Sequence, residues 1–147
     1  MNAFVAAGAG FLLAVLWFDL MFDVQARGGA EVPEGALASI AGYYARVTTG
    51  ARPMNRLVAT AMLATLAAIV VQLAEGDDAA WVGWTSLALV AGAVGLAGGH
   101  TVPAAVRLGT RRDALDDQRR LARSILRDHL ICITAIALVL VLQLAFA

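Results

Sequence analysis

The chain contains no lysine and a single cysteine, Cys132. One cysteine cannot form a disulfide within the chain, and we interpret this one as a small apolar residue in the last apolar run. No basic residue precedes Arg27, so the first apolar run lacks the positive segment that opens a cleavable signal peptide. We expect that run to remain as a permanent membrane span.

Several catalytic and binding motifs are also missing. We find no glycine-rich phosphate loop, no nucleophile elbow and no zinc-ligand spacing. The arginines after residue 106 alternate with Asp113, Asp116, Asp117 and Asp128, which favours a solvated or lipid-facing surface over a nucleic-acid site. We therefore predict no nucleic-acid partner.

The residues that are present are mostly apolar, at 61% hydrophobic content with no net charge. Four runs are nearly free of charge, and each approaches the roughly 20 residues that a helix needs to cross about 30 Å of hydrocarbon. The sequence predicts one all-α integral membrane domain, a four-transmembrane-helix bundle with amphipathic cytosolic helices in its two long connections. The predicted spans are residues 2–23, 54–74, 79–103 and 125–147.

The charged residues are distributed asymmetrically along the chain. All arginines lie in or beside the two long connections, whereas residues 75–80 contain three acids and no base. Because arginine-rich loops stay in the cytosol, we predict that both termini lie outside it, in a bacterial inner membrane. The arginine excess should attract anionic lipid headgroups.

The two long connections also contain helical patterns. Apolar residues recur at helical spacing from Glu34 to Val47, which predicts an amphipathic helix on the membrane surface with Tyr43 and Tyr44 at headgroup depth. Pro103 should bend or unwind the third span near His100, because proline lacks a backbone donor. From about Arg111 to the C-terminus one continuous helix is expected.

Small residues at helical spacing favour close packing of membrane helices. In the first span they are Ala6, Gly10 and Ala14. In the third span they are Ala88, Gly92, Gly95 and Gly99, so we expect the third span to be the close-packed centre of the bundle.

The predicted topology brings polar residues to the cytosolic end of every span. Asp19 is the most informative, because it lies inside the apolar boundary, where a charge needs a partner or a wet cavity. We take the candidate polar cluster, a possible ligand site, to be Asp19, Asp23, Arg52, Arg56, His100, Arg107, Asp128 and His129.

Three interpretations of this cluster stay open. The aspartates of the first span could form structural ion pairs with Arg52, Arg56 or Arg107. Alternatively, Asp19 could pair with His129 or His100 in a ligand or proton site. A metal site of two carboxylates and two histidines is the third, although the chain lacks the Glu-x-x-His motif of di-iron bundles and we assign no metal. The cofactor is unknown.

Two segments, TVPAAVRL at residues 101–108 and LARSILRDHL at residues 121–130, resemble the anthrone-oxygenase-like family of small four-span bacterial membrane proteins. The resemblance implies a four-helix bundle related to proteins proposed to oxidise lipophilic aromatics, with His129 as the corresponding histidine. This chain departs from that family after His129, where no further arginine follows. The layout is also similar to the four-span protoporphyrinogen-oxidase type, but that type has a histidine in its first span and this chain has none.

Two functional hypotheses follow. The first is a non-catalytic accessory or structural subunit that packs against other membrane helices, in a homo-oligomer or a larger complex. The alternative is an oxidoreductase or binding protein for a small lipophilic molecule, aromatic or quinone-like, that meets the polar cluster from the bilayer. An ion or proton transporter is a third hypothesis, in which the four spans would have to assemble with others to form a path.

Overall fold

The structure is a computed structural model that describes residues 1–27, 31–76 and 79–147. These residues contain helices and no strand, which confirms the all-α expectation. In chain order the elements are α1 (Asn2–Asp23), the 3-10 helix η1 (Val24–Arg27), α2 (Glu34–Tyr44), the π-helix η2 (Ala45–Gly50), α3 (Arg52–Glu75), α4 (Ala80–Leu96), the π-helix η3 (Ala97–Thr101), α5 (Val102–Thr110) and α6 (Leu115–Ala145).

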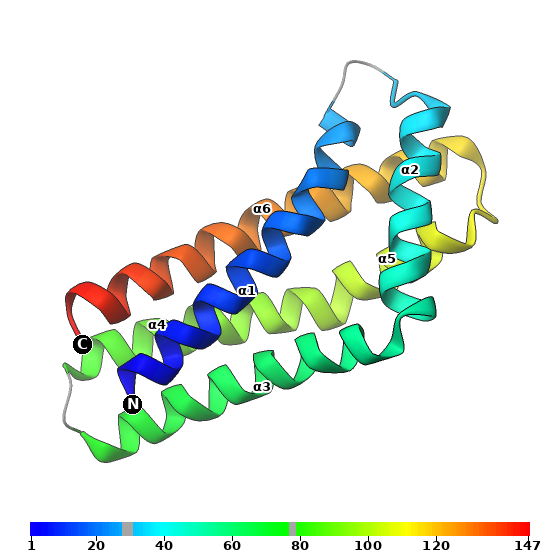
Figure 1. The fold of residues 1–147 in the computed structure, drawn as a ribbon. Helices are drawn as coiled ribbons and strands as arrows, with labels where there is room; N and C mark the ends of the chain where they lie inside the picture. Colours follow the sequence, from blue (N-terminus) through cyan, green and yellow to red (C-terminus); the bar gives the residue numbers. More distant parts are fainter. Residues whose placement is uncertain (28–30, 77–78) are drawn as a thin grey trace.

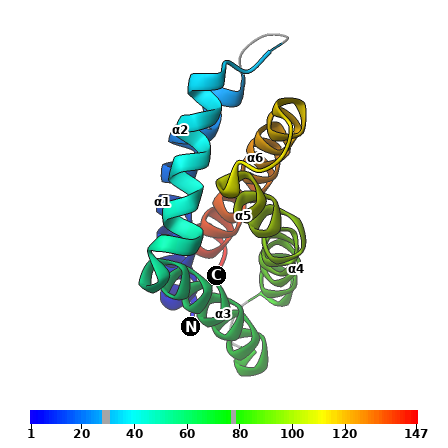
Figure 2. The same cartoon turned by 90° about the vertical axis from the view of Figure 1, so that its right-hand side faces the viewer.

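Four helical segments are long and apolar enough to cross a membrane, namely Asn2–Arg27, Pro53–Glu75, Ala80–Thr110 and Leu115–Ala145. They indicate a multi-pass membrane protein. Both chain termini lie at one end of the bundle, beside the connection between α3 and α4 (Figure 1). We call the opposite end, which holds α2, α5 and the first turns of α6, the polar end. Figure 2 views the molecule from this end, with α2 and α5 nearest the viewer.

The central helix of the bundle is α6, not the third span. Inside the molecule, 39% of the apolar window of α6 is buried, against 17% to 22% for the other three spans. The stripe of Ala88, Gly92, Gly95 and Gly99 is exposed, and a Cβ added to any of its three glycines would meet nothing within 4 Å. The expectation of a close-packed third span was therefore wrong, because α4 turns another face, which includes Val82, Ser86 and Val90, inward.

The predicted stripe of the first span is also not where α1 packs closely. Ala14 is exposed, and a Cβ on Gly10 would have no neighbour. The close approach of α1 to α3 occurs at Gly8, where an added Cβ would collide with the side chain of Thr65. Small residues mark possible close contacts, but the rotation of each helix decides which of them are used.

The amphipathic helix α2 packs on protein instead of lipid. Its stripe of Leu37, Ile40, Ala41 and Tyr44 is buried in a core shared with α5 and α6. Leu108 and Ile125 are among the residues that complete this core, and both are fully buried. The prediction of a helix was confirmed, and its apolar stripe faces protein; its depth relative to the membrane stays a prediction.

The break expected near Pro103 is present as the π-helix η3, which occupies Ala97–Thr101 directly before Pro103 in the first turn of α5. The helix predicted from about Arg111 begins four residues later, at Leu115. Arg111 has a positive φ of 51° and ends α5 in the left-handed conformation. A single helix from Arg111 is therefore not possible, and the long helix expected here is α6.

Gly8→Ala should destabilise the fold by about 1–3 kcal/mol, the usual cost of overpacking a well-packed contact. The added methyl would force Thr65 away from α1, and Thr65 is held in place because its hydroxyl donates to the carbonyl of Ala61 at 2.8 Å. Thermal unfolding in detergent measures the effect. Gly10→Ala is the matched control in the same helix, and an equal loss in both variants would contradict the assignment.

Candidate functional site

The polar end is organised around two carboxylates on α1. Asp19 and Asp23 are one helical turn apart and so share a face of α1. Two consecutive tyrosines of α2 reach them. The Tyr43 hydroxyl donates to Oδ1 of Asp19 at 2.7 Å, and the Tyr44 hydroxyl donates to Oδ1 of Asp23 at 2.6 Å. The structure thus pairs both tyrosines with the aspartates of the first span, and their expected headgroup depth stays a prediction.

His129 of α6 completes this group. Its Nδ1 lies 2.6 Å from Oδ2 of Asp23, and its Nε2 lies 3.8 Å from Oδ2 of Asp19. The Tyr44 hydroxyl oxygen is 3.5 Å from the same Nδ1. We call Asp19, Asp23, Tyr43, Tyr44 and His129 the His129 cluster. It joins α1, α2 and α6 through side chains, and Asp23 is fully buried within it.

The two tyrosines are well suited to act as permanent donors. Burial raises the pKa of the Tyr44 hydroxyl, and the nearby Asp23 carboxylate raises it further. Burial and the Asp19 carboxylate likewise raise the pKa of Tyr43, whose ring stacks on Phe22 at 4.1 Å between centroids. Both hydroxyls therefore keep their protons around neutral pH and continue to donate to the aspartates.

A second group lies on another side of α6. Oδ2 of Asp128 is 2.5 Å from Nδ1 of His100 and accepts a hydrogen bond from the Thr101 hydroxyl at 3.1 Å. Oδ1 of the same carboxylate is 3.6 Å from the Arg127 guanidinium. We call His100, Thr101, Arg127 and Asp128 the His100 cluster. Asp128 is fully buried, and η3 places the two residues from the third span beside it.

The two clusters separate the residues that a metal site would need together. Neighbouring residues on a helix point about 100° apart, so Asp128 faces η3 while His129 faces α1. Each histidine pairs with its own carboxylate. Among residues 1–27, 31–76 and 79–147, no group of three or more histidine, cysteine or acidic side chains could hold a metal ion.

Two of the three arginines named in the ion-pair interpretation, Arg56 and Arg107, do not pair with the aspartates of α1 in the described part of the chain. Arg107 forms a two-pronged contact with Asp113, at 2.8 and 2.9 Å, and this contact lowers the pKa of the Asp113 carboxyl. Arg56 is exposed, and no ion pair links it to either aspartate in the described part of the chain. The Arg52 side chain lies outside the described residues. Long arginine side chains reach solvent, whereas tyrosine and histidine fit the buried space beside α1.

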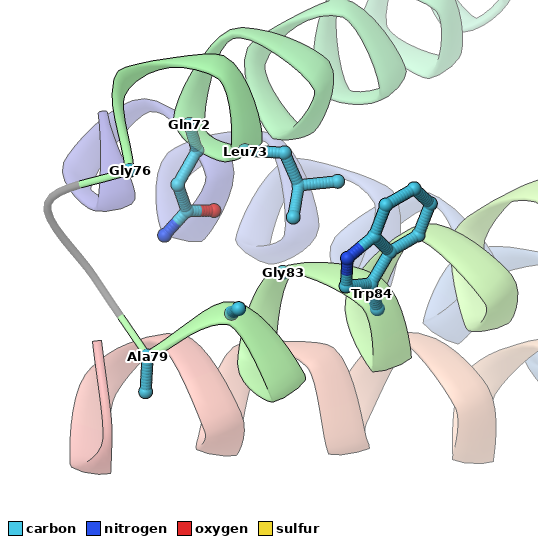
Figure 3. A pocket seen from close by; sticks show the side chains of 7 residues that line it. Gln72, Leu73, Gly76, Ala79, Gly83 and Trp84 are labelled. Carbon is cyan, nitrogen blue, oxygen red and sulfur yellow. The ribbon is translucent and has the colours of Figure 1, made fainter.

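A third polar group lies at the opposite end of the bundle and has no counterpart in the sequence-based predictions. The Gln72 amide donates to Oε1 of Gln143 at 3.0 Å, and the Gln143 amide donates to the Ser86 hydroxyl at 3.1 Å. Gln72 also lines a hollow of about 120 Å³ with Gly83 and Trp84 among its walls (Figure 3). The sequence feature that could have predicted this group is a glutamine near the outer end of each of two apolar runs, Gln72 in one and Gln143 in the other.

No protein-family model, curated protein or solved structure matches the chain. The interpretation of its polar end therefore depends on the geometry of the chain itself.

Tyr44→Phe should destabilise the protein by about 1.5–3 kcal/mol, because it removes a hydrogen bond to a buried carboxylate. Tyr43→Phe is the matched variant and should cost less, since the Asp19 side chain keeps 15% of its surface exposed and water can replace the lost donor. Unfolding of both variants in detergent provides the comparison. Equal and negligible effects would show that the tyrosines do not hold α2 against α1.

Proposed function

We propose that this chain is a non-catalytic accessory or structural membrane subunit whose polar end is locked by the His129 cluster. The observation that carries the proposal is that the polar side chains of this cluster contact one another and join three helices. Two hollows in the described part of the chain lie elsewhere, one beside Gln72 and the other between Arg107 and Ser124. The side chains of the His129 cluster bond to each other and lie beside neither hollow. This arrangement favours a structural contact that holds the helices together over a reaction site.

The proposed partner is a helix of another membrane subunit that packs on α4. The exposed residues Ala88, Gly92, Gly95 and Gly99 support this role, since small residues allow two helix backbones to approach closely in lipid. The partner helix belongs either to a second copy of this chain or to a different membrane protein.

The proposed orientation places the polar end in the cytosol and both termini outside, in a bacterial inner membrane. The distribution of arginine supports it, because the arginines lie in the two connections at the polar end or beside them, and the short connection at the other end is acidic.

An alternative function has one specific observation in its favour. Nε2 of His129 is 3.8 Å from Asp19, beyond hydrogen-bond distance, so this nitrogen could meet the polar group of a lipophilic molecule. Such a molecule would make the chain a binding protein or oxidoreductase. The proposed relationship to the anthrone-oxygenase-like family, through residues 101–108 and 121–130, belongs to this alternative.

Purification in a mild detergent tests the assembly and separates the two functions. We expect a colourless protein without stoichiometric metal that runs as a larger assembly, and Gly95→Leu should shift it towards the monomer because the larger side chain blocks close helix contact. Ala67→Leu, on the exposed face of α3, is the control and should leave the assembly intact. A bound chromophore, or a protein that is monomeric before substitution, would overturn the accessory function in favour of the alternative.

The orientation is tested by labelling intact cells with a membrane-impermeant thiol reagent. Arg112→Cys places a thiol on the exposed surface of the polar end, and Ala79→Cys places one in the acidic connection, while the native Cys132 is buried. We expect labelling at residue 79 and none at residue 112 until the cells are broken. The reverse pattern would place the arginine-rich connections outside.

A further inference from the structure

We propose that His100 and Arg127 form a binding site for the phosphate of an anionic phospholipid headgroup. This inference goes beyond the proposed function and does not depend on it. It requires that the chain crosses a bilayer, but not that a partner subunit covers α4.

The two residues are held side by side by one buried anion. The Asp128 side chain is 1% exposed, whereas the side chains of His100 and Arg127 are 49% and 70% exposed. Asp128 contacts His100 through one carboxylate oxygen and Arg127 through the other, at 2.5 and 3.6 Å. The carboxylate therefore anchors both side chains from below and leaves their outer ends open.

The outer ends carry the donors that a phosphate needs. A guanidinium has five N–H donors, and Oδ1 of Asp128 accepts no hydrogen bond, so its 3.6 Å contact with Arg127 is an ion pair that leaves the donors available. Nδ1 of His100 faces Asp128, so the other ring nitrogen, Nε2, is left for a headgroup. Arg127 supplies the positive charge that attracts a phosphate.

The path to the two side chains is open. Gly98 and Gly99 directly precede His100, both are exposed, and a Cβ on either would meet nothing within 4 Å. No side chain at these two positions can cover the imidazole, so a headgroup can approach the ring from the side of the third span.

The depth of the site favours a lipid phosphate over a free one. His100 is 20 residues beyond Ala80, where α4 begins, which is about 30 Å of helix and one hydrocarbon thickness. Arg127 lies three residues before Leu130, where the uncharged part of α6 begins. Both side chains thus lie at the boundary where phospholipid phosphates are found, and cationic residues at that depth attract anionic lipid.

Native mass spectrometry of the full-length protein tests the site, after reconstitution with equal amounts of phosphatidylglycerol and phosphatidylcholine and extraction in mild detergent. We expect the wild-type chain to retain phosphatidylglycerol in preference to phosphatidylcholine. Arg127→Gln should reduce the phosphatidylglycerol adduct about tenfold, as expected for one charge-assisted contact. His100→Gln should reduce the adduct as well. Arg112 is an exposed arginine between α5 and α6, and Arg112→Gln should leave the adduct unchanged.

Several outcomes would overturn the site. Equal retention of both lipids by the wild-type chain would do so, as would an equal loss in Arg127→Gln and Arg112→Gln, which would indicate diffuse attraction by surface charge. Displacement of the lipid by millimolar inorganic phosphate would reassign the site to free phosphate. Thermal unfolding of each variant identifies any loss that comes from misfolding, and the wild-type lipid preference stands as a test even if a variant fails to fold.

Discussion

A carboxylate buried in a membrane bundle needs partners from the same molecule, and this requirement shapes the polar end. Asp23 and Asp128 are both fully buried, one on the first helix and one on the last. Leaving either unpaired would cost several kcal/mol, because the surrounding apolar groups cannot solvate the charge. The structure meets this cost by bringing a tyrosine and a histidine to Asp23 and a second histidine and a threonine to Asp128.

The same requirement explains why α6 lies at the centre. Asp128 and His129 are adjacent, so one helix serves two clusters that face different neighbours. Around them, α2 and α5 supply the apolar core of the polar end, in which Leu37, Ile40 and Leu108 are fully buried. In the span region a separate apolar core forms, in which Val5, Ile69 and Val139 are fully buried. Apolar packing therefore holds the spans together. At the polar end, where the helices meet the arginine-rich connections, the polar pairs determine which helix faces contact each other.

The two clusters differ in how they meet their surroundings, and this difference supports giving them separate roles. The His129 cluster is enclosed by three helices and its side chains bond to one another, which favours a structural role in holding these helices together. In the His100 cluster the Asp128 carboxylate is buried, while the side chains of His100 and Arg127 reach outward. A buried charge that orients exposed charges of opposite sign suits recognition of an external anion.

The sequence by itself determined the four apolar segments, the helical class, the gathering of Asp19, Asp23, His100 and His129 near one end, and the break before Pro103. These follow from hydropathy, charge and backbone chemistry, all of which are read along the chain. Only the tertiary structure decided which helix is central and that the two tyrosines of α2 meet the aspartates of α1. Those choices depend on how each helix is rotated about its axis and crosses its neighbours. A residue such as Gly95 looks the same in sequence whether it faces a partner or the outside, because the rotation results from packing over the whole bundle.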